Sequence, residues 1–215
     1  MTPALQSHAA LALCRLAPVM PVLVIEELRH AVPLARALVA GGLPVLEVTL
    51  RTGCALEAIA AMARVTGARV GAGTVLSAHD AARVKAAGGG FAVSPGATPG
   101  LIAACTAQKL PLVPGAATTS EAMGLLDAGY RVLKFFPAVP AGGIAMLSAL
   151  RGPLPQALFL PTGGITAETA PDWLNLQNVV CVGGSWVAPA AMIRAGDWDG
   201  IERRARAAAA LLRED

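Results

Sequence analysis

Eight short apolar runs, spaced at intervals of about 20 to 26 residues, limit most strongly how this chain of 215 residues can fold. The runs lack a clean alternation of apolar and polar residues, which is typical of strands buried on both faces of a parallel sheet. Between them lie Ala-rich segments of helical period that open with Ser or Thr and close with Gly, residues that suit helix ends. The runs cover 19–25, 44–50, 68–75, 91–96, 110–116, 131–137, 157–164 and 178–186.

Strand followed by helix, repeated eight times, predicts an α/β fold in which a parallel sheet closes into a (β/α)8 TIM barrel. We expect one domain over residues 1–215: an N-terminal helix in 1–17, the barrel in 18–199 and a C-terminal helix in 200–215. The N-terminal helix would cap the bottom of the barrel. A doubly wound open sheet is the alternative, but no GxGxxG motif follows the first run.

The composition excludes several classes of protein. Hydrophobic residues make up 55% of the chain and charged residues 14%, as expected for a globular protein with a large core. The longest apolar stretch, 16–25, falls short of the roughly 18 residues that span a bilayer, and no basic segment precedes the apolar N-terminal residues. We therefore expect a cytoplasmic protein with no membrane partner. A net charge of +3, with 4% aromatic residues and no basic cluster, argues against nucleic acid as a partner.

The cysteines and histidines do not form a metal-binding pattern. No CxxC pair occurs, so the sequence predicts neither a zinc site nor a disulfide framework, and we expect no metal. We interpret the cysteines as small buried hydrophobic residues and the histidines as surface or helix-capping residues. The residues concerned are Cys14, Cys54, Cys105, Cys181, His8, His30 and His79.

Lys134 is the most unusual residue of the apolar runs, because Leu133 and Phe135 flank it. Burying an ammonium group there is costly unless the group is paired or gives up its proton. In a parallel barrel the active site lies at the C-terminal ends of the strands, where the hydrocarbon walls of Phe135 or Phe136 would favour the neutral amine. A neutral lysine can attack a carbonyl and form a Schiff base. The alternative is a solvated strand face with no chemical role.

A carboxylate occupies a similar place in another run. Glu47 lies inside 44–50, where it could form a structural ion pair with a cation of a neighbouring strand, or could act as a desolvated general acid/base. Arg51 follows at the end of that run and suits a carboxylate ligand. The small residues of 71–74 would let a ligand approach the backbone, and Thr74 offers a hydroxyl group.

Two glycine pairs end the last two runs, in "PTGGI" (161–165) and "VGGSW" (182–186). Their backbone N–H groups could face an anion ahead of a helix N-terminus, and phosphate-binding barrels commonly hold phosphate between these two loops. The glycines could also simply make tight turns. With Arg51 and Lys134, the pattern favours a substrate that carries a carboxylate, a carbonyl and a phosphate.

From about residue 18 to residue 199 the sequence resembles the family of 2-keto-3-deoxy-6-phosphogluconate (KDPG) and 4-hydroxy-2-oxoglutarate (KHG) aldolases, which are class I pyruvate aldolases. The segments that carry this resemblance include "LPVLEVTLRT", "VGAGTVL", "FAVSPG", "KFFPA", "PTGGI" and "VGGSW". The resemblance implies a (β/α)8 barrel, cleavage of KDPG to pyruvate and D-glyceraldehyde 3-phosphate without metal or cofactor, a homotrimer, and a place in the Entner–Doudoroff pathway.

The resemblance also implies a role for each site residue, because the roles of the family's residues can be carried over to the matching positions. Lys134 would form the Schiff base with the C2 carbonyl, and Glu47 would be the general acid/base that works through water. The remaining residues would bind or enclose the substrate: Arg51, Thr74 and Thr162 at the carboxylate, Pro95 and Phe136 in the pocket wall, and Gly163, Gly164, Gly183, Gly184 and Ser185 at the phosphate.

Several other functions share parts of this pattern. An aldolase specific for KHG would have no use for a phosphate site, so the glycine pairs and Ser185 favour the phosphorylated substrate, and the enzyme could process both. An aldolase for the 6-phosphogalactonate epimer stays open. A metal-dependent sugar-phosphate epimerase would need His and Asp ligands at strand ends, and none of the three histidines lies on a predicted strand. A non-catalytic sugar-phosphate-binding module would have no reason to bury a lysine and a glutamate together.

Overall fold

The computed structural model describes residues 1–211, and within this part nine parallel strands form two curled sheets. The first sheet has the order β5-β4-β3-β2-β1-β9 and the second has the order β6-β7-β8. The strands are β1 (Val19–Leu23), β2 (Val45–Thr49), β3 (Arg69–Gly73), β4 (Ala92–Val93), β5 (Leu112–Val113), β6 (Gly115–Ala116), β7 (Val132–Phe135), β8 (Leu158–Pro161) and β9 (Val182–Gly184).

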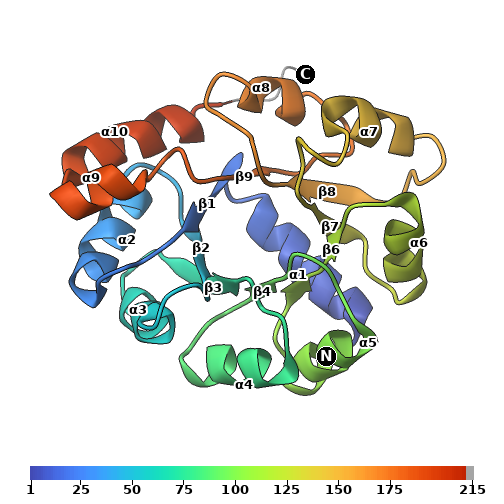
Figure 1. Cartoon of the computed structure of the whole chain (residues 1–215), viewed down its shortest axis with the longest axis horizontal. Helices are drawn as coiled ribbons and strands as arrows, with labels where there is room; N and C mark the ends of the chain where they lie inside the picture. Colours follow the sequence, from blue (N-terminus) through green and yellow to red (C-terminus); the bar gives the residue numbers. More distant parts are fainter. Residues whose placement is uncertain (212–215) are drawn as a thin grey trace.

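Helices surround the two sheets in the order of the sequence, and α1 crosses behind the strands (Figure 1). Ser77, Thr98 and Thr118 cap α4, α5 and α6 through their side-chain oxygens, as the Ser/Thr openings of these segments predicted. The helices are α1 (Pro3–Cys14), the 3-10 helix η1 (Leu28–His30), α2 (Ala31–Ala40), α3 (Ala55–Met62), α4 (Ala78–Ala86), α5 (Pro99–Ala107), α6 (Thr119–Asp127), α7 (Gly143–Leu150), α8 (Ala170–Leu174), α9 (Ala190–Ala195) and α10 (Trp198–Ala209).

The prediction of a parallel α/β fold is confirmed, and each of the eight predicted runs contains a strand. The continuous closed barrel of eight strands is not what the structure shows. Run 110–116 is interrupted at Pro114, which has no N–H group for a strand ladder, so β5 joins the first sheet and β6 the second. Elsewhere the two sheets meet at isolated parallel bridges, Phe159 with Val179 and Thr162 with Gly183.

Two apolar cores occupy the two faces of the sheets. The larger core lies between the sheets and the helices and includes Leu46 and Leu133, whereas a smaller inner core includes Val45 and Val132. Successive side chains of a strand point to opposite faces, so residues two positions apart share a face. Lys134 and Glu47 therefore lie on the inner face, two residues after Val132 and Val45 respectively. This alternation sets the place of the candidate site.

Helix α1 closes the N-terminal end of the inner core, as the sequence predicted. Its Ala10 and Cys14 belong to that core. The Ser7 Oγ atom accepts hydrogen bonds from the N–H groups of Arg131 (2.8 Å) and Val132 (3.0 Å), at the start of β7. A helix outside the strand–helix repeat therefore seals the end of the sheets opposite to the strand ends that carry the candidate residues.

The last helix, α10, begins at Trp198, two residues before the predicted boundary, and ends at Ala209. Residues 212–215 of the predicted helix 200–215 lie outside the described residues. None of the helices within residues 1–211 has both the length and the hydropathy of a membrane-spanning segment.

The interpretation of the cysteines and histidines holds in part. Cys14, Cys105 and Cys181 are buried as predicted, and Cys54 is half-buried, with its Sγ atom donating to the Ile25 carbonyl (3.2 Å). His30 is buried, with its ring centroid 5.8 Å from that of Trp198, so a surface position is wrong for it; it stands at the N-cap position of α2, without a side-chain capping hydrogen bond. Among the described residues, no group of three His, Cys, Asp or Glu side chains could hold a metal ion.

Candidate active site

A buried ion pair forms the centre of the candidate site. Lys134 Nζ on β7 donates to Glu47 Oε1 on β2 at 3.1 Å, and the two side chains are 6% and 1% exposed. Lys134 Nζ also lies 5.4 Å from the centroid of the Phe136 ring. Lys134 is therefore not on a solvated strand face. The sequence predicts Glu47 to be either a structural ion-pair partner or a general acid/base. Both remain compatible with the structure, because the cation that Glu47 pairs with is Lys134, the candidate nucleophile.

Two oxygen atoms of this region have no hydrogen-bond partner among the described residues. Glu47 Oε2 and Thr162 Oγ1 are both buried and unpaired. A buried polar atom without a partner costs about 1–3 kcal/mol, so such atoms in a native structure call for an explanation. Thr162 directly follows β8, one residue after Pro161, which pairs with Phe135. A bound polar molecule could supply the missing partners.

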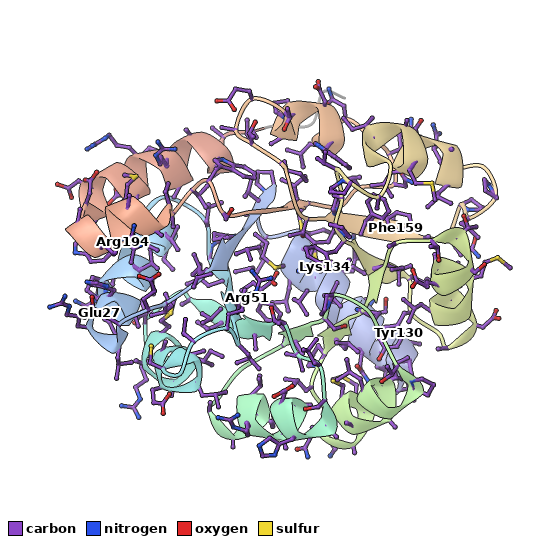
Figure 2. All side chains as sticks on the ribbon, in the orientation of Figure 1. Glu27, Arg51, Tyr130, Lys134, Phe159 and Arg194 are labelled. Carbon is purple, nitrogen blue, oxygen red and sulfur yellow. The ribbon has the colours of Figure 1, made fainter. Side chains whose placement is uncertain are left out.

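Arg51 and Thr74 lie together at the C-terminal ends of neighbouring strands. The Arg51 Nε atom donates to Thr74 Oγ1 at 3.2 Å, and Arg51 itself is exposed. Thr74 has a φ of 59°, in the left-handed region that residues other than glycine rarely adopt, at a cost on the order of 1–3 kcal/mol. Arg51 and Lys134 both lie inside the ring of helices (Figure 2). An exposed guanidinium group thus stands at the open end of the site.

Pro95 and Phe136 follow strands β4 and β7 at the same end of the sheets, and both are half-buried. The backbone of Pro95 packs closely against Gly115, where an added Cβ atom would overlap the Pro95 carbonyl group. Gly115 in turn pairs with Lys134, and the Phe136 ring lies 5.4 Å from Lys134 Nζ, so both predicted pocket residues lie at the edge of the candidate site.

The bridge between Thr162 and Gly183 brings the two glycine pairs side by side. Gly163 and Gly164 have φ values of 107° and 84°, a conformation that favours glycine. Gly183 and Gly184 are buried in β9, and Ser185 after them is exposed. Each pair precedes a helix in the chain, as predicted, but several residues separate them, because α8 begins at Ala170 and α9 at Ala190. Any anion site at these loops depends on loop N–H groups and Ser185.

The interpretation of the small residues of 71–74 needs correction. An added Cβ atom at Gly71 would lie 2.5 Å from the Phe91 ring, and one at Gly73 would overlap Glu47 Oε1. Both glycines therefore accommodate neighbouring side chains, Glu47 on β2 and Phe91 just before β4, rather than leaving the backbone open to a ligand. Two glycines spaced two residues apart on a strand share one face, which is the signal that sequence reasoning missed.

Comparison with known proteins identifies similar chains over nearly the whole length. The family described as KDPG and KHG aldolase matches residues 11–204. The KHG/KDPG aldolase of Escherichia coli K12 is 52% identical over 192 residues, which cover 89% of this chain and 90% of the relative.

Solved structures give the same result. The KDPG aldolase of Zymomonas mobilis ZM4, determined with 3-phosphoglycerate, has a TM-score of 0.90 and 50% identity, covering 94% of this chain and 95% of the other. The KDPG aldolase of Legionella pneumophila, with pyruvate captured as a covalent carbinolamine intermediate, has a TM-score of 0.91 and 46% identity, covering 93% of this chain and 98% of the other.

Proposed function

The chain belongs to the KDPG and KHG aldolase family, and we propose that it is a class I aldolase that cleaves KDPG to pyruvate and D-glyceraldehyde 3-phosphate. We propose that it also cleaves KHG, to pyruvate and glyoxylate. The observation that carries the proposal is the buried contact between Lys134 Nζ and Glu47 Oε1 at 3.1 Å. It joins a candidate nucleophile to a candidate proton acceptor, and both side chains are largely buried.

The first step would be the attack of Lys134 on the C2 carbonyl. The ammonium group must lose a proton to become nucleophilic, and Glu47 Oε1 is the group positioned to accept it. Addition gives a carbinolamine, and loss of water gives a protonated imine. The Legionella relative, which holds pyruvate as a carbinolamine, supports this order of events.

Cleavage would then use the imine as an electron sink. The bond between C3 and C4 breaks, its electrons move through C3 toward the cationic nitrogen, and a neutral enamine forms. Glu47, through a water molecule, takes the proton of the C4 hydroxyl as the aldehyde leaves and later returns a proton to C3. Hydrolysis of the imine releases pyruvate and regenerates Lys134.

The surrounding residues would bind the two charged ends of the substrate. We propose Arg51, Thr74 and Thr162 for the carboxylate, because Arg51 is exposed beside Thr74 and Thr162 Oγ1 has an unused hydrogen-bonding capacity. Pro95 and Phe136 would enclose the chain of the substrate. The phosphate would bind at the adjacent glycine loops, to N–H groups of Gly163, Gly164, Gly183 and Gly184 and to the Ser185 hydroxyl.

Trapping of the Schiff base tests this proposal. Pyruvate followed by borohydride should add the mass of one reduced adduct to the peptide that contains Lys134, and should leave the exposed Lys85 and Lys109 unlabelled. Lys134→Met keeps the volume of the side chain but removes the ion-pair partner of the buried Glu47 carboxylate, so its folding is checked by circular dichroism, and the folded variant should lose both labelling and cleavage. Persisting label, or activity within about tenfold of the parent, would reject Lys134 as the nucleophile.

We propose further that the chain forms one domain, assembles as a homotrimer and works in the cytoplasm in the Entner–Doudoroff pathway. The resemblance to the family supports the homotrimer and the pathway. A molar mass in solution close to three times 21.7 kDa, measured by light scattering, is the expected outcome for the trimer.

A further inference from the structure

Gly73, on β3, lies against the carboxylate of Glu47. It is buried, and a Cβ atom added to it would overlap Glu47 Oε1 and lie 2.8 Å from both Cδ and Cγ of Glu47. Real Cβ atoms do not make such contacts, so any other residue at position 73 would displace the carboxylate. The space left by the missing side chain is occupied by the proposed acid/base group.

The register of the strands shows how Glu47 reaches this space. Glu47 pairs with Gly71 across the β2–β3 ladder, whereas Gly73 pairs with Thr49. The carboxylate therefore extends along β3 to the residue two positions beyond its own partner, a distance of about 6–7 Å in strand geometry. This direction is toward the C-terminal ends of the strands, where Arg51 and Thr74 meet.

Two contacts then hold the carboxylate in place: the backbone of Gly73 on one side and Lys134 Nζ on the other. With Oε1 engaged, Oε2 is left buried and without a partner among the described residues. Thr162 also packs against a glycine. A Cβ atom added at Gly183 would overlap Thr162 Oγ1, which is the second unpaired oxygen of the site. Each unpaired oxygen thus belongs to a side chain that fits against a glycine.

We infer that Gly73 is a positioning residue for Glu47. Because Gly73 has no side chain, the Glu47 carboxylate can lie against its backbone, with Oε1 beside Lys134 and Oε2 available for proton transfer. The catalytic part of this inference rests on the proposed role of Glu47 as acid/base. The steric part rests on the coordinates alone. In this role Gly73 acts only through Glu47.

The first test is the Gly73→Ala variant. Displacement of the carboxylate should lower kcat about tenfold or more, while KM changes less than about threefold and pyruvate–borohydride labelling of Lys134 still reaches completion. The matched control is Gly71→Ala, on the same strand and the same face, where the added methyl group meets the Phe91 ring instead of Glu47. A kcat of Gly73→Ala within twofold of the parent would overturn the inference.

A double-mutant cycle separates positioning from general damage to the fold. Glu47→Asp withdraws the carboxylate by one methylene group, so Gly73→Ala should cost less than about threefold in kcat in that background, compared with about tenfold in the parent. Gly71→Ala should cost the same factor in both backgrounds. Equal costs of Gly73→Ala in both backgrounds would contradict the inference.

If Gly73→Ala does not fold, thermal unfolding of Glu47→Ala and Glu47→Ala/Gly73→Ala decides. Removal of the carboxylate vacates the space, so the double variant should fold, and its Tm should lie within a few degrees of that of Glu47→Ala. A double variant that fails to fold would overturn the steric inference.

A failure of the proposed function would give a different result. A parent protein that does not cleave KDPG, or a Glu47→Gln variant that turns over at the parent rate, would remove the catalytic role of Glu47. The comparison of unfolding temperatures would stay unchanged in both cases.

Discussion

Glu47 uses only one of its two oxygens in the structure, and this asymmetry gives the residue its proposed function. Oε1 accepts from Lys134 and Oε2 accepts from no described residue. The unpaired Oε2 leaves a position for the water molecule or substrate hydroxyl that a general acid/base must contact. At the scale of single residues, the site therefore consists of a buried amine, a half-used carboxylate and an unpaired hydroxyl on Thr162.

Glu47→Gln should form the Schiff base more slowly but still reach complete labelling, since water can take the Lys134 proton in its place, and it should slow turnover. The amide retains an oxygen that can accept from Lys134 but cannot take or return a proton, so kcat should fall by about 10²–10⁴-fold. Steady-state rates with KDPG and borohydride labelling with pyruvate measure the two steps separately. An unchanged rate would reduce Glu47 to a structural partner of Lys134.

Arg51→Ala and Ser185→Ala should separate the two ends of the substrate. Arg51→Ala removes a charge-assisted contact to the carboxylate, so KM should rise about tenfold or more for both KDPG and KHG. Ser185→Ala should raise KM only for KDPG, since KHG has no phosphate. Equal effects of Ser185→Ala on both substrates would place the phosphate elsewhere.

At the scale of elements, α1 is distinctive because it lies outside the strand–helix repeat and yet contributes to the inner core. Its attachment is polar as well as apolar. Gln6 Oε1 accepts from the Tyr130 hydroxyl at 2.9 Å, Gln6 Nε2 donates to Thr106 Oγ1 at 2.9 Å, and Ser7 accepts from the start of β7. These bonds join α1 to α5 and β7, far from the strand ends that carry the candidate site.

Ser7→Ala should therefore destabilise the protein without slowing catalysis. It leaves the N–H groups of Arg131 and Val132 without their hydroxyl acceptor, which should lower the free energy of unfolding by about 1–3 kcal/mol. The value of kcat should stay within twofold of the parent. Ser120→Ala, at an exposed position of α6, is the control and should change the free energy of unfolding by less than about 0.5 kcal/mol.

The stability of the whole molecule should fall at alkaline pH. Burial raises the pKa of the Cys105 thiol from 9.0 to about 11. Burial also raises the pKa of the Tyr130 hydroxyl well above its usual value, with a smaller contribution from Cys105. The folded protein thus retains these protons at a pH where the unfolded chain loses them. The stabilisation is fully present below about pH 9 and is lost as the pH rises toward 11.

Cys105→Ala tests this pH dependence. Between pH 9 and 10.5 the free energy of unfolding should fall less in the variant than in the parent, by at most about 2 kcal/mol, because one group with a raised pKa is gone. Urea unfolding at several pH values measures the difference. The same slope in parent and variant would show that Cys105 does not contribute.

The sequence by itself determined the order of strands and helices and which residues of one strand share a face. Apolar runs alternating with capped helical segments indicate parallel strands covered by helices, and the period of two in a strand puts Lys134 on the face of Val132 and Glu47 on the face of Val45. Local spacing and side-chain chemistry decide these features. They were enough to single out Lys134, Glu47 and Arg51.

The tertiary structure alone decided which of these residues meet. The contact between Lys134 and Glu47 joins positions 87 apart in the chain, on strands of different sheets. Pro114 divides one predicted strand between the two sheets, and Gly73 receives a carboxylate from the neighbouring strand. Such contacts depend on strand register, on the curl of the sheets and on the direction of each side chain along its strand. None of these is encoded in the spacing of residues within a single run, because each is set by the packing of segments far apart in the sequence.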